Sequence, residues 1–197
     1  MLRNLVEVFQ DRVTLPIEVT EIRTAIQTIG FQDRIILSAR TLDTEVLRGT
    51  FYQWTERATL YGEPQLVTLV IYPENINICW QRLICAKEMV HVCDQQIAKT
   101  VDIEAIVKLA EKLLGPSKAE ATDVTDVMAL VDKLAQFQAL DLLFPKAARA
   151  VAKLKLADNS KTLLEIAEWA KIPQQYVELA LTDQWETISA RFLSMHD

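Results

Sequence analysis

A strong β-strand followed by an almost entirely helical remainder limits the folds that this chain can adopt. The segment Gln65–Tyr72 (QLVTLVIY) is rich in β-branched residues and is bounded by Tyr61–Pro64 and Pro73–Asn75, both typical of turns. Val46–Leu60 is rich in Thr, Tyr, Phe and Trp, so the two segments predict an antiparallel pair. From Asn77 onward the pattern is helical. The chain therefore predicts an α+β fold with a small antiparallel sheet and a mainly helical C-terminal half.

Apolar residues at helical spacing predict further elements on both sides of these strands. Val19–Thr28 predicts a helix that stops at Gly30, and a β-like patch follows at Arg34–Leu37. Lys118–Asp123 is polar and predicted to be exposed, and Asp158–Ser160 predicts a turn. Later helices are predicted over Trp80–Gln96, Val101–Leu114, Asp126–Asp141 and Ala147–Leu156, and on either side of a break at Ile172-Pro173.

Composition narrows the class of protein. The chain has 197 residues, half of them hydrophobic, and only four Gly and six Pro, which suits one domain with a small appendage. A net charge of −6 argues against a surface that grips nucleic acid. We expect a cytoplasmic protein without membrane partners, because we find no leader-like segment and no apolar run that could span a bilayer. The three cysteines lack C-x-x-C spacing, which favours a reducing compartment.

The helix predicted over Trp80–Gln96 carries the chemically most informative segment, Lys87–His91 (KEMVH). It differs by one residue from H-E-x-x-H, a pattern that places two zinc-binding histidines on one helix face with a glutamate as general base. Glu88 and His91 occupy the expected positions, but Lys87 replaces the first histidine. Lysine at neutral pH is an ammonium without an acceptor, so it does not coordinate zinc. The segment predicts a metallopeptidase, or a metallopeptidase fold without the metal chemistry.

The order of elements around this segment resembles the ImmA/IrrE family of zincin-like metallopeptidases. In that family a strand ends near an asparagine, and an arginine precedes A-H-E-x-x-H by a few residues. Leu66–Tyr72 resembles the strand, and Asn75 or Asn77 its end. Arg82 matches the arginine, and Ala86–His91 (AKEMVH) resembles the metal-binding segment. The resemblance implies that Arg82 lies near the entrance of the site and takes part in binding.

Two later blocks are similar to the same family and lie in the same order. Leu134–Pro145 (LAQFQALDLLFP) is similar to a helix of the form E-A-N-x-F-A-x-x-L-L-M-P, which contributes a third, carboxylate ligand. Thr162–Thr182 resembles the small helix-turn-helix-like tail that often follows. The resemblance therefore implies a zincin-like domain over residues 1–160, with a helix-turn-helix-like tail over residues 161–197 packed on it.

The family's ligand set is altered in this chain. Where the resemblance implies His, His and Glu, the sequence offers Lys87, His91 and Leu134, and the nearest upstream carboxylate is Asp132. A catalytic zinc site needs about three protein ligands and an open position for water. We therefore expect no bound metal, with zinc as the alternative cofactor, and Glu88 becomes a relic of the general base.

The electrostatics of a buried site explains why a lysine can occupy the position of the first histidine. Lys87 and His91 are four residues apart and share a helix face, so the ammonium would project toward the place of the metal. A fixed positive charge can replace the cation and pair with Glu88, or with Asp132 from the later helix. Buried carboxylates without a counter-ion would cost on the order of several kcal/mol per ion. We therefore predict that a lysine–carboxylate pair holds the site together.

Three functions are compatible with these patterns. The first is a pseudoenzyme, a catalytically inactive metallopeptidase-like protein that binds a protein or peptide by strand addition to the sheet edge. The resemblance implies regulation of a repressor or transcription factor in a phage or stress response. The second is an active zinc endopeptidase with His91 and either Asp132 or Glu88 as rearranged ligands. The third is a DNA-binding regulator using the C-terminal helices, although Gln174–Thr182 contains no Lys or Arg for phosphate contacts.

Simpler interpretations stand beside these functions. The spacing E-x-x-H is common by chance on helices, and Glu88 and His91 would then form an ordinary surface pair. Arg82 would be a surface charge near the start of a helix. The cysteines would be small buried hydrophobes.

Overall fold

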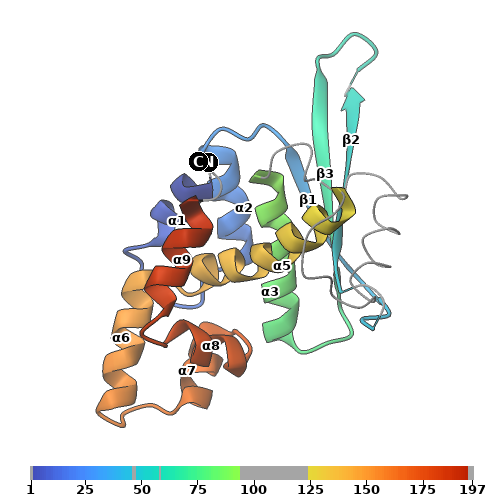
Figure 1. The fold of residues 1–197 in the computed structure, drawn as a ribbon. Helices are drawn as coiled ribbons and strands as arrows, with labels where there is room; N and C mark the ends of the chain where they lie inside the picture. The colour runs from blue at the N-terminus through green and yellow to red at the C-terminus, as the bar shows by residue number, and fades with distance from the viewer. Residues whose placement is uncertain (1, 46–47, 58, 94–123, 195–197) are drawn as a thin grey trace.

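A computed structural model of the protein describes residues 2–45, 48–57, 59–93 and 124–194. Its elements, in chain order, are α1 (Leu2–Phe9), α2 (Val19–Thr28), β1 (Arg34–Arg40), β2 (Thr50–Arg57), β3 (Pro64–Pro73), α3 (Ile78–Val90), the 3-10 turn η1 (His91–Cys93), α5 (Val124–Leu143), α6 (Lys146–Ala157), α7 (Leu163–Ala170), α8 (Gln174–Ala180) and α9 (Trp185–Ser194). The predicted α+β class is confirmed, because a small three-stranded sheet follows two helices and helices form most of the described later half (Figure 1).

The sheet has three strands in the order β1-β3-β2 and is mixed. The predicted antiparallel hairpin of β2 and β3 is confirmed, with Phe51 opposite Val70. The prediction of an antiparallel sheet is wrong for β1, which runs parallel to β3 with Ile35 opposite Thr68. Side-chain patterns define strands and turns but not strand direction. The chain crosses from β1 to the far edge before β3 returns between the two strands, and this crossing makes β1 and β3 parallel.

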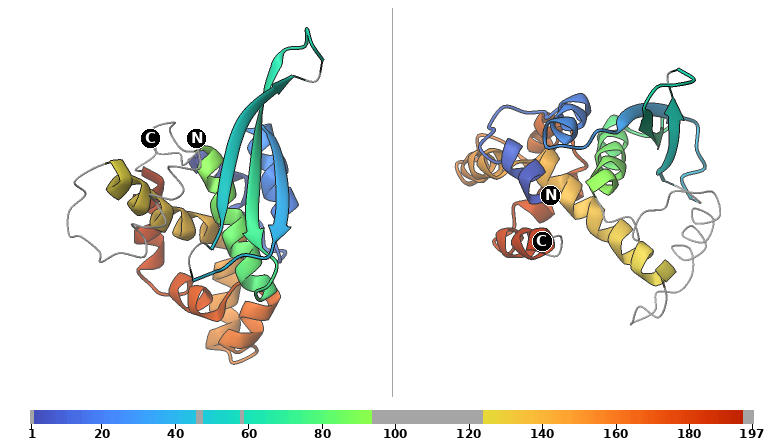
Figure 2. Two further views of the ribbon diagram at one scale, coloured as in Figure 1. Left: turned by 90° about the vertical axis from the view of Figure 1, so that its right-hand side faces the viewer. Right: turned by 90° about the horizontal axis from the view of Figure 1, so that it is seen from above.

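The helices lie on one side of the sheet, and the β2–β3 hairpin extends beyond them (Figure 2). The inner face of the sheet contributes Ile35, Phe51 and Val70 to the hydrophobic core, where they join Leu83 and Met89 of α3. Because α3 contacts both β3 and α5, it lies between the sheet and the other helices. Among the described residues, no helix has the length and apolar character needed to cross a membrane.

The helix predicted over Trp80–Gln96 is observed as α3 followed by η1. The side chain of Asn77 caps α3 by accepting a 2.8 Å hydrogen bond from the backbone N–H of Cys79. The α-helix ends at Val90, so His91 lies in the 3-10 turn just beyond it. The remaining part of this prediction, residues 94–96, lies outside the described residues, as do Val101–Leu114 and Lys118–Asp123.

The other predicted helices are confirmed, and two helices were not predicted. The observed bounds of α2 equal the predicted ones, whereas α5, α6 and the α7–α8 pair differ slightly from them. The predicted turn is confirmed, with Asn159 at a φ of 58°. The unpredicted helices α1 and α9 contact each other and α5. They contribute Leu2, Leu5 and Trp185, which are fully buried.

Candidate functional site

Four residues singled out in the sequence form a buried group between α3, η1 and α5, here called the lysine cluster: Lys87, Glu88, His91 and Asp132. Lys87 Nζ lies 2.6 Å from Asp132 Oδ1 and 2.8 Å from Glu88 Oε1. His91 Nε2 lies 3.4 Å from Asp132 Oδ1. The ammonium therefore bridges carboxylates from two helices, so the predicted ion pair is present and involves both acids.

Because the lysine cluster is buried, its charged groups strongly shift one another's pKa values. Lys87 is 8% exposed and Glu88 is 2% exposed. Burial alone would lower the pKa of Lys87, but the carboxylates of Glu88 and Asp132 outweigh it and raise that pKa above its usual range. Burial would raise the pKa of Asp132, yet Lys87 and His91 hold it well below its usual range. Lys87 is therefore a firmly charged ammonium facing an ionised Asp132.

Glu88 is the least satisfied member of the lysine cluster. Its Oε1 lies within ion-pair distance of Lys87, but the approach falls outside hydrogen-bond geometry. Among the described residues, this oxygen is the one buried side-chain polar atom without a hydrogen bond. Burial raises the pKa of Glu88, against the opposing influence of Lys87 and His91. Native proteins seldom leave a buried polar atom without a hydrogen bond, so the ion pair with Lys87 is the contact that offsets the burial of this oxygen.

The segment that leads into β2 lies directly against the lysine cluster. A Cβ at Gly49 would lie 2.5 Å from Ile84 Cγ2 and 2.8 Å from Glu88 Oε1, so only glycine permits this approach to α3. Phe51, on the inner face of β2, stacks on the ring of His91 with centroids 5.7 Å apart. The start of β2, an edge strand of the sheet, therefore covers the cluster.

The simpler surface interpretation of the motif is wrong, since Glu88 and His91 are both buried. Leu134, where the resemblance implies a carboxylate ligand, is a half-buried side chain on α5. The acid that meets Lys87 and His91 is Asp132. Cys85 is buried, and burial raises the pKa of its thiol to about 12, as expected for an inert core residue.

Arg82 is buried and connects three segments of the chain. Its side chain donates hydrogen bonds to the backbone oxygen of Ile17 at 2.6 Å, to Glu18 Oε2 at 2.9 Å and to the backbone oxygen of Lys171 at 3.2 Å. The interpretation as a surface charge is wrong, because the residue is 5% exposed. Its role in binding stays a prediction. The contacts that the structure shows join α3 to the segment before α2 and to the α7–α8 turn.

The α7–α8 pair and α9 lie in the part of the chain that resembles a helix-turn-helix-like tail. Thr162 and Glu165 form a capping box at the start of α7, and Lys171 ends that helix in a left-handed conformation with a φ of 51°. Tyr176 on α8 meets Trp80 on α3 edge to face, with ring centroids 5.7 Å apart. The helix that would read DNA in the third hypothesis is therefore packed against α3 through Tyr176.

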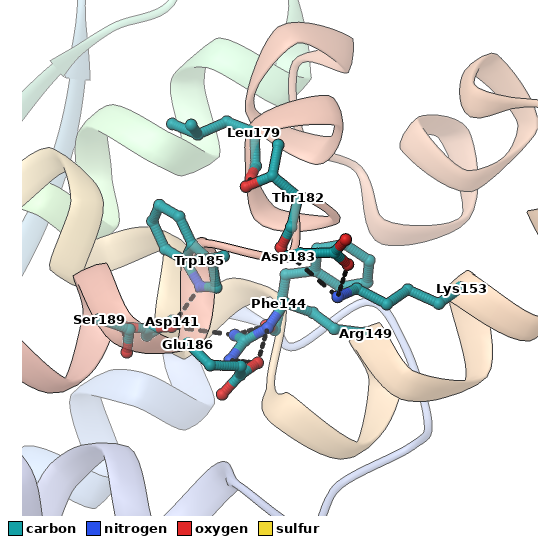
Figure 3. Close-up of polar contacts among 10 residues, drawn as sticks. All are labelled: Asp141, Phe144, Arg149, Lys153, Leu179, Thr182, Asp183, Trp185, Glu186 and Ser189. Carbon is teal, nitrogen blue, oxygen red and sulfur yellow. Dashed lines mark hydrogen bonds and ion pairs between the residues drawn. The ribbon is translucent and has the colours of Figure 1, made fainter.

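A second buried group, here called the arginine network, joins α5, α6 and α9 (Figure 3). The Asp141 carboxylate accepts hydrogen bonds from Arg149, Trp185 and Ser189 at 2.9, 3.1 and 2.6 Å. Arg149 also donates to the backbone oxygen just after α5 at 2.6 Å and pairs with Glu186 at 3.0 Å. No pattern in the sequence predicts this network, because its members are far apart in the chain.

Comparison of the chain with models of known protein families, with curated proteins and with solved structures finds no match. The resemblance to the ImmA/IrrE family therefore stays a prediction that rests on the motif segments. In the part of the chain that the structure describes, no three His, Cys, Asp or Glu side chains are grouped to hold a metal ion. The lysine cluster does not fit zinc, since the charged Lys87 offers no lone pair and already binds both carboxylates.

Proposed function

We propose that this protein is a catalytically inactive, metallopeptidase-like protein that works by binding a protein partner. The observation that carries the proposal is the Lys87 ammonium between Glu88 and Asp132. In a metallopeptidase a cation polarises the scissile carbonyl and activates a water molecule. An ammonium balances the charge of the same carboxylates but has no open coordination position for water. The lysine cluster would thus preserve the shape of a peptide site without its chemistry.

The exposed sheet edge beside the lysine cluster supports an extended peptide as the part of the partner that binds. Since β2 is an edge strand, its outer side offers backbone donors and acceptors that no other strand of the described sheet uses. Phe51 of the same strand stacks on His91, so a segment added to β2 would lie beside the cluster. The resemblance suggests a repressor or transcription factor as the partner. The bound peptide would then be an extended segment of that partner.

Selection of binders from a displayed library of extended peptides, with the full chain as bait, tests this proposal. Synthetic copies of the selected peptides should lose binding when alternate backbone nitrogens are methylated, because strand addition needs those donors. The peptides should also be recovered intact after incubation with the protein and added zinc.

Other outcomes of the selection would contradict the proposal. A library without enriched peptides, or binders that tolerate methylation, would exclude strand addition to β2. Cleavage that is lost in Glu88→Gln would instead favour the zinc endopeptidase with rearranged ligands.

A further inference from the structure

A pocket of about 500 Å³ lies between α3, α8 and the segment that leads into β2. Its apolar wall is formed by Ile76, Trp80 and Ile84. Its polar rim includes Glu45, Arg48 and Gln175. Sites for small ligands measure about 300–1,000 Å³ and combine an apolar lining with a few polar groups. The pocket has both the size and the composition of a binding site.

The pocket adjoins the lysine cluster along one face of α3. Trp80, Ile84 and Glu88 are spaced four residues apart, so their side chains follow one another along the helix. Ile84 lines the pocket and also faces Gly49, the residue that packs against Glu88. The pocket therefore begins one helical turn before the unsatisfied carboxylate, beside the strand to which a peptide would add.

Contacts outside the pocket hold two of its walls in place. Tyr176 packs on Trp80, and Arg82 donates to the backbone of the α7–α8 turn, so α8 is fixed against α3. The Asn75 side chain donates to the backbone oxygen of Leu42 at 3.0 Å and accepts from its N–H at 3.4 Å, which anchors the chain two residues before Thr44, another residue of the pocket wall. A preformed pocket binds with a smaller ordering cost than one that must be assembled.

We propose that this pocket binds a large apolar side chain, aromatic or aliphatic, of the partner peptide. The inference rests on the proposed function, because it assigns the residue that a strand-adding peptide places next to β2. The apolar wall receives the side chain. Glu45 and Arg48 form no ion pair with described residues, so they are available to the adjacent peptide backbone. The α8 helix then serves as a wall of a peptide site.

The indole N–H signals of the four tryptophans in a nuclear magnetic resonance spectrum report occupancy of the pocket. Trp80 lines the pocket, whereas Trp185 is fully buried and bonded to Asp141, so it is an internal control. We expect N-acetyl-L-phenylalaninamide to shift the Trp80 signal saturably, with a Kd on the order of millimolar. N-acetyl-L-alaninamide has the same backbone and should bind at least roughly tenfold more weakly, because it buries much less apolar area.

Two adjacent exposed glutamines on α8 provide matched variants. Gln175→Phe would place a ring in the pocket and should abolish the Trp80 shift. Gln174→Phe changes the neighbouring residue, which does not line the pocket, and should leave the shift intact. An unmoved Trp80 signal in the wild type, or equal shifts in both variants, would overturn the inference.

The selected peptides separate this inference from the proposed function. A peptide that binds Gln175→Phe as tightly as the wild type, yet still loses binding on backbone methylation, would overturn the pocket and leave strand addition intact. Weaker binding to Gln175→Phe than to Gln174→Phe is the result that the pocket predicts.

Discussion

The lysine cluster and the arginine network are both buried and both anchored on α5, yet they differ in how fully their polar groups are satisfied. In the arginine network, Asp141 accepts three hydrogen bonds and Arg149 contacts two carboxylates and a backbone oxygen. In the lysine cluster, Glu88 Oε1 has no hydrogen bond. A satisfied network rigidifies a fold. Burial raises the pKa of both Asp141 and Glu88, so the two groups differ in hydrogen bonding and not in the direction of these pKa shifts. We therefore expect the arginine network to contribute more to stability, and the proposed function places the lysine cluster at the binding site.

The largest loss of stability is expected from Arg149→Met. Removal of the guanidinium leaves Asp141 buried without its counter-ion, which costs about 3–5 kcal/mol in comparable buried pairs. Urea denaturation at pH 7 measures the loss. Lys153→Met is the control on the same helix, because Lys153 Nζ lies 3.8 Å from the fully exposed Asp183 and should contribute little. Equal stabilities of the two variants would show that the arginine network does not stabilise the fold.

Lys87→Met should come next, with a loss of about 3 kcal/mol at pH 7. Glu88 and Asp132 lose their shared ammonium, but His91 remains 3.4 Å from Asp132 and limits the cost. The folded-state pKa of Asp132 is lowered, so its stabilising contribution exists above its ordinary pKa and is lost as the pH falls below it. The difference from wild type should therefore stay constant near neutral pH and shrink as the pH falls below about 4. A difference that is independent of pH would contradict the ion-pair account.

Gly49→Ala should cost about 1–3 kcal/mol through overpacking against Ile84 and Glu88. Glu88→Ala should relieve part of this cost in a double-mutant cycle, because it removes one of the two atoms that the new Cβ would meet. Gly62→Ala is the comparison, since a Cβ there would meet only Thr59 of the same hairpin turn, at 2.9 Å from its hydroxyl and 3.3 Å from its backbone nitrogen, and not α3. Additive effects of Gly49→Ala and Glu88→Ala would argue against the close packing described.

The smallest expected effect is also the most discriminating, because the same chemical change should have opposite signs in the two groups. Asp141→Asn should destabilise the fold by about 1–3 kcal/mol by removing the charge partner of Arg149. Glu88→Gln should be neutral or stabilise by up to about 1 kcal/mol at pH 7, since it removes a charge that burial disfavours while Lys87 keeps its ion pair with Asp132.

The pH dependence of the Glu88→Gln effect provides a check on its origin. Because burial raises the pKa of Glu88, wild-type stability that depends on its protonated form is lost as the pH rises through the folded-state pKa. The advantage of Glu88→Gln should therefore grow from pH 4 to pH 7 in urea denaturation. A loss of stability comparable to that of Asp141→Asn would show that Glu88 is a structural ion.

The sequence predicted local elements well and tertiary relations only where a motif linked distant segments. The periodic segments α2 and β3 were found, and the pairing of Lys87 with Asp132 was anticipated across two helices. The sequence does not predict that β1 runs parallel to β3, because the residue pattern of a strand does not show which strand lies beside it or in which direction that strand runs. Gly49 and the arginine network depend on close approaches between distant segments, and no spacing in the chain marks them.

The metal content of the protein, purified without a metal-affinity tag, decides whether Lys87 occupies the place of a metal ion. Elemental analysis should be made on the wild type and on His91→Ala. Because the Lys87 ammonium binds both carboxylates, the account predicts no stoichiometric metal in either protein. One zinc ion per chain in the wild type, lost in His91→Ala, would contradict the claim that a lysine has replaced the metal.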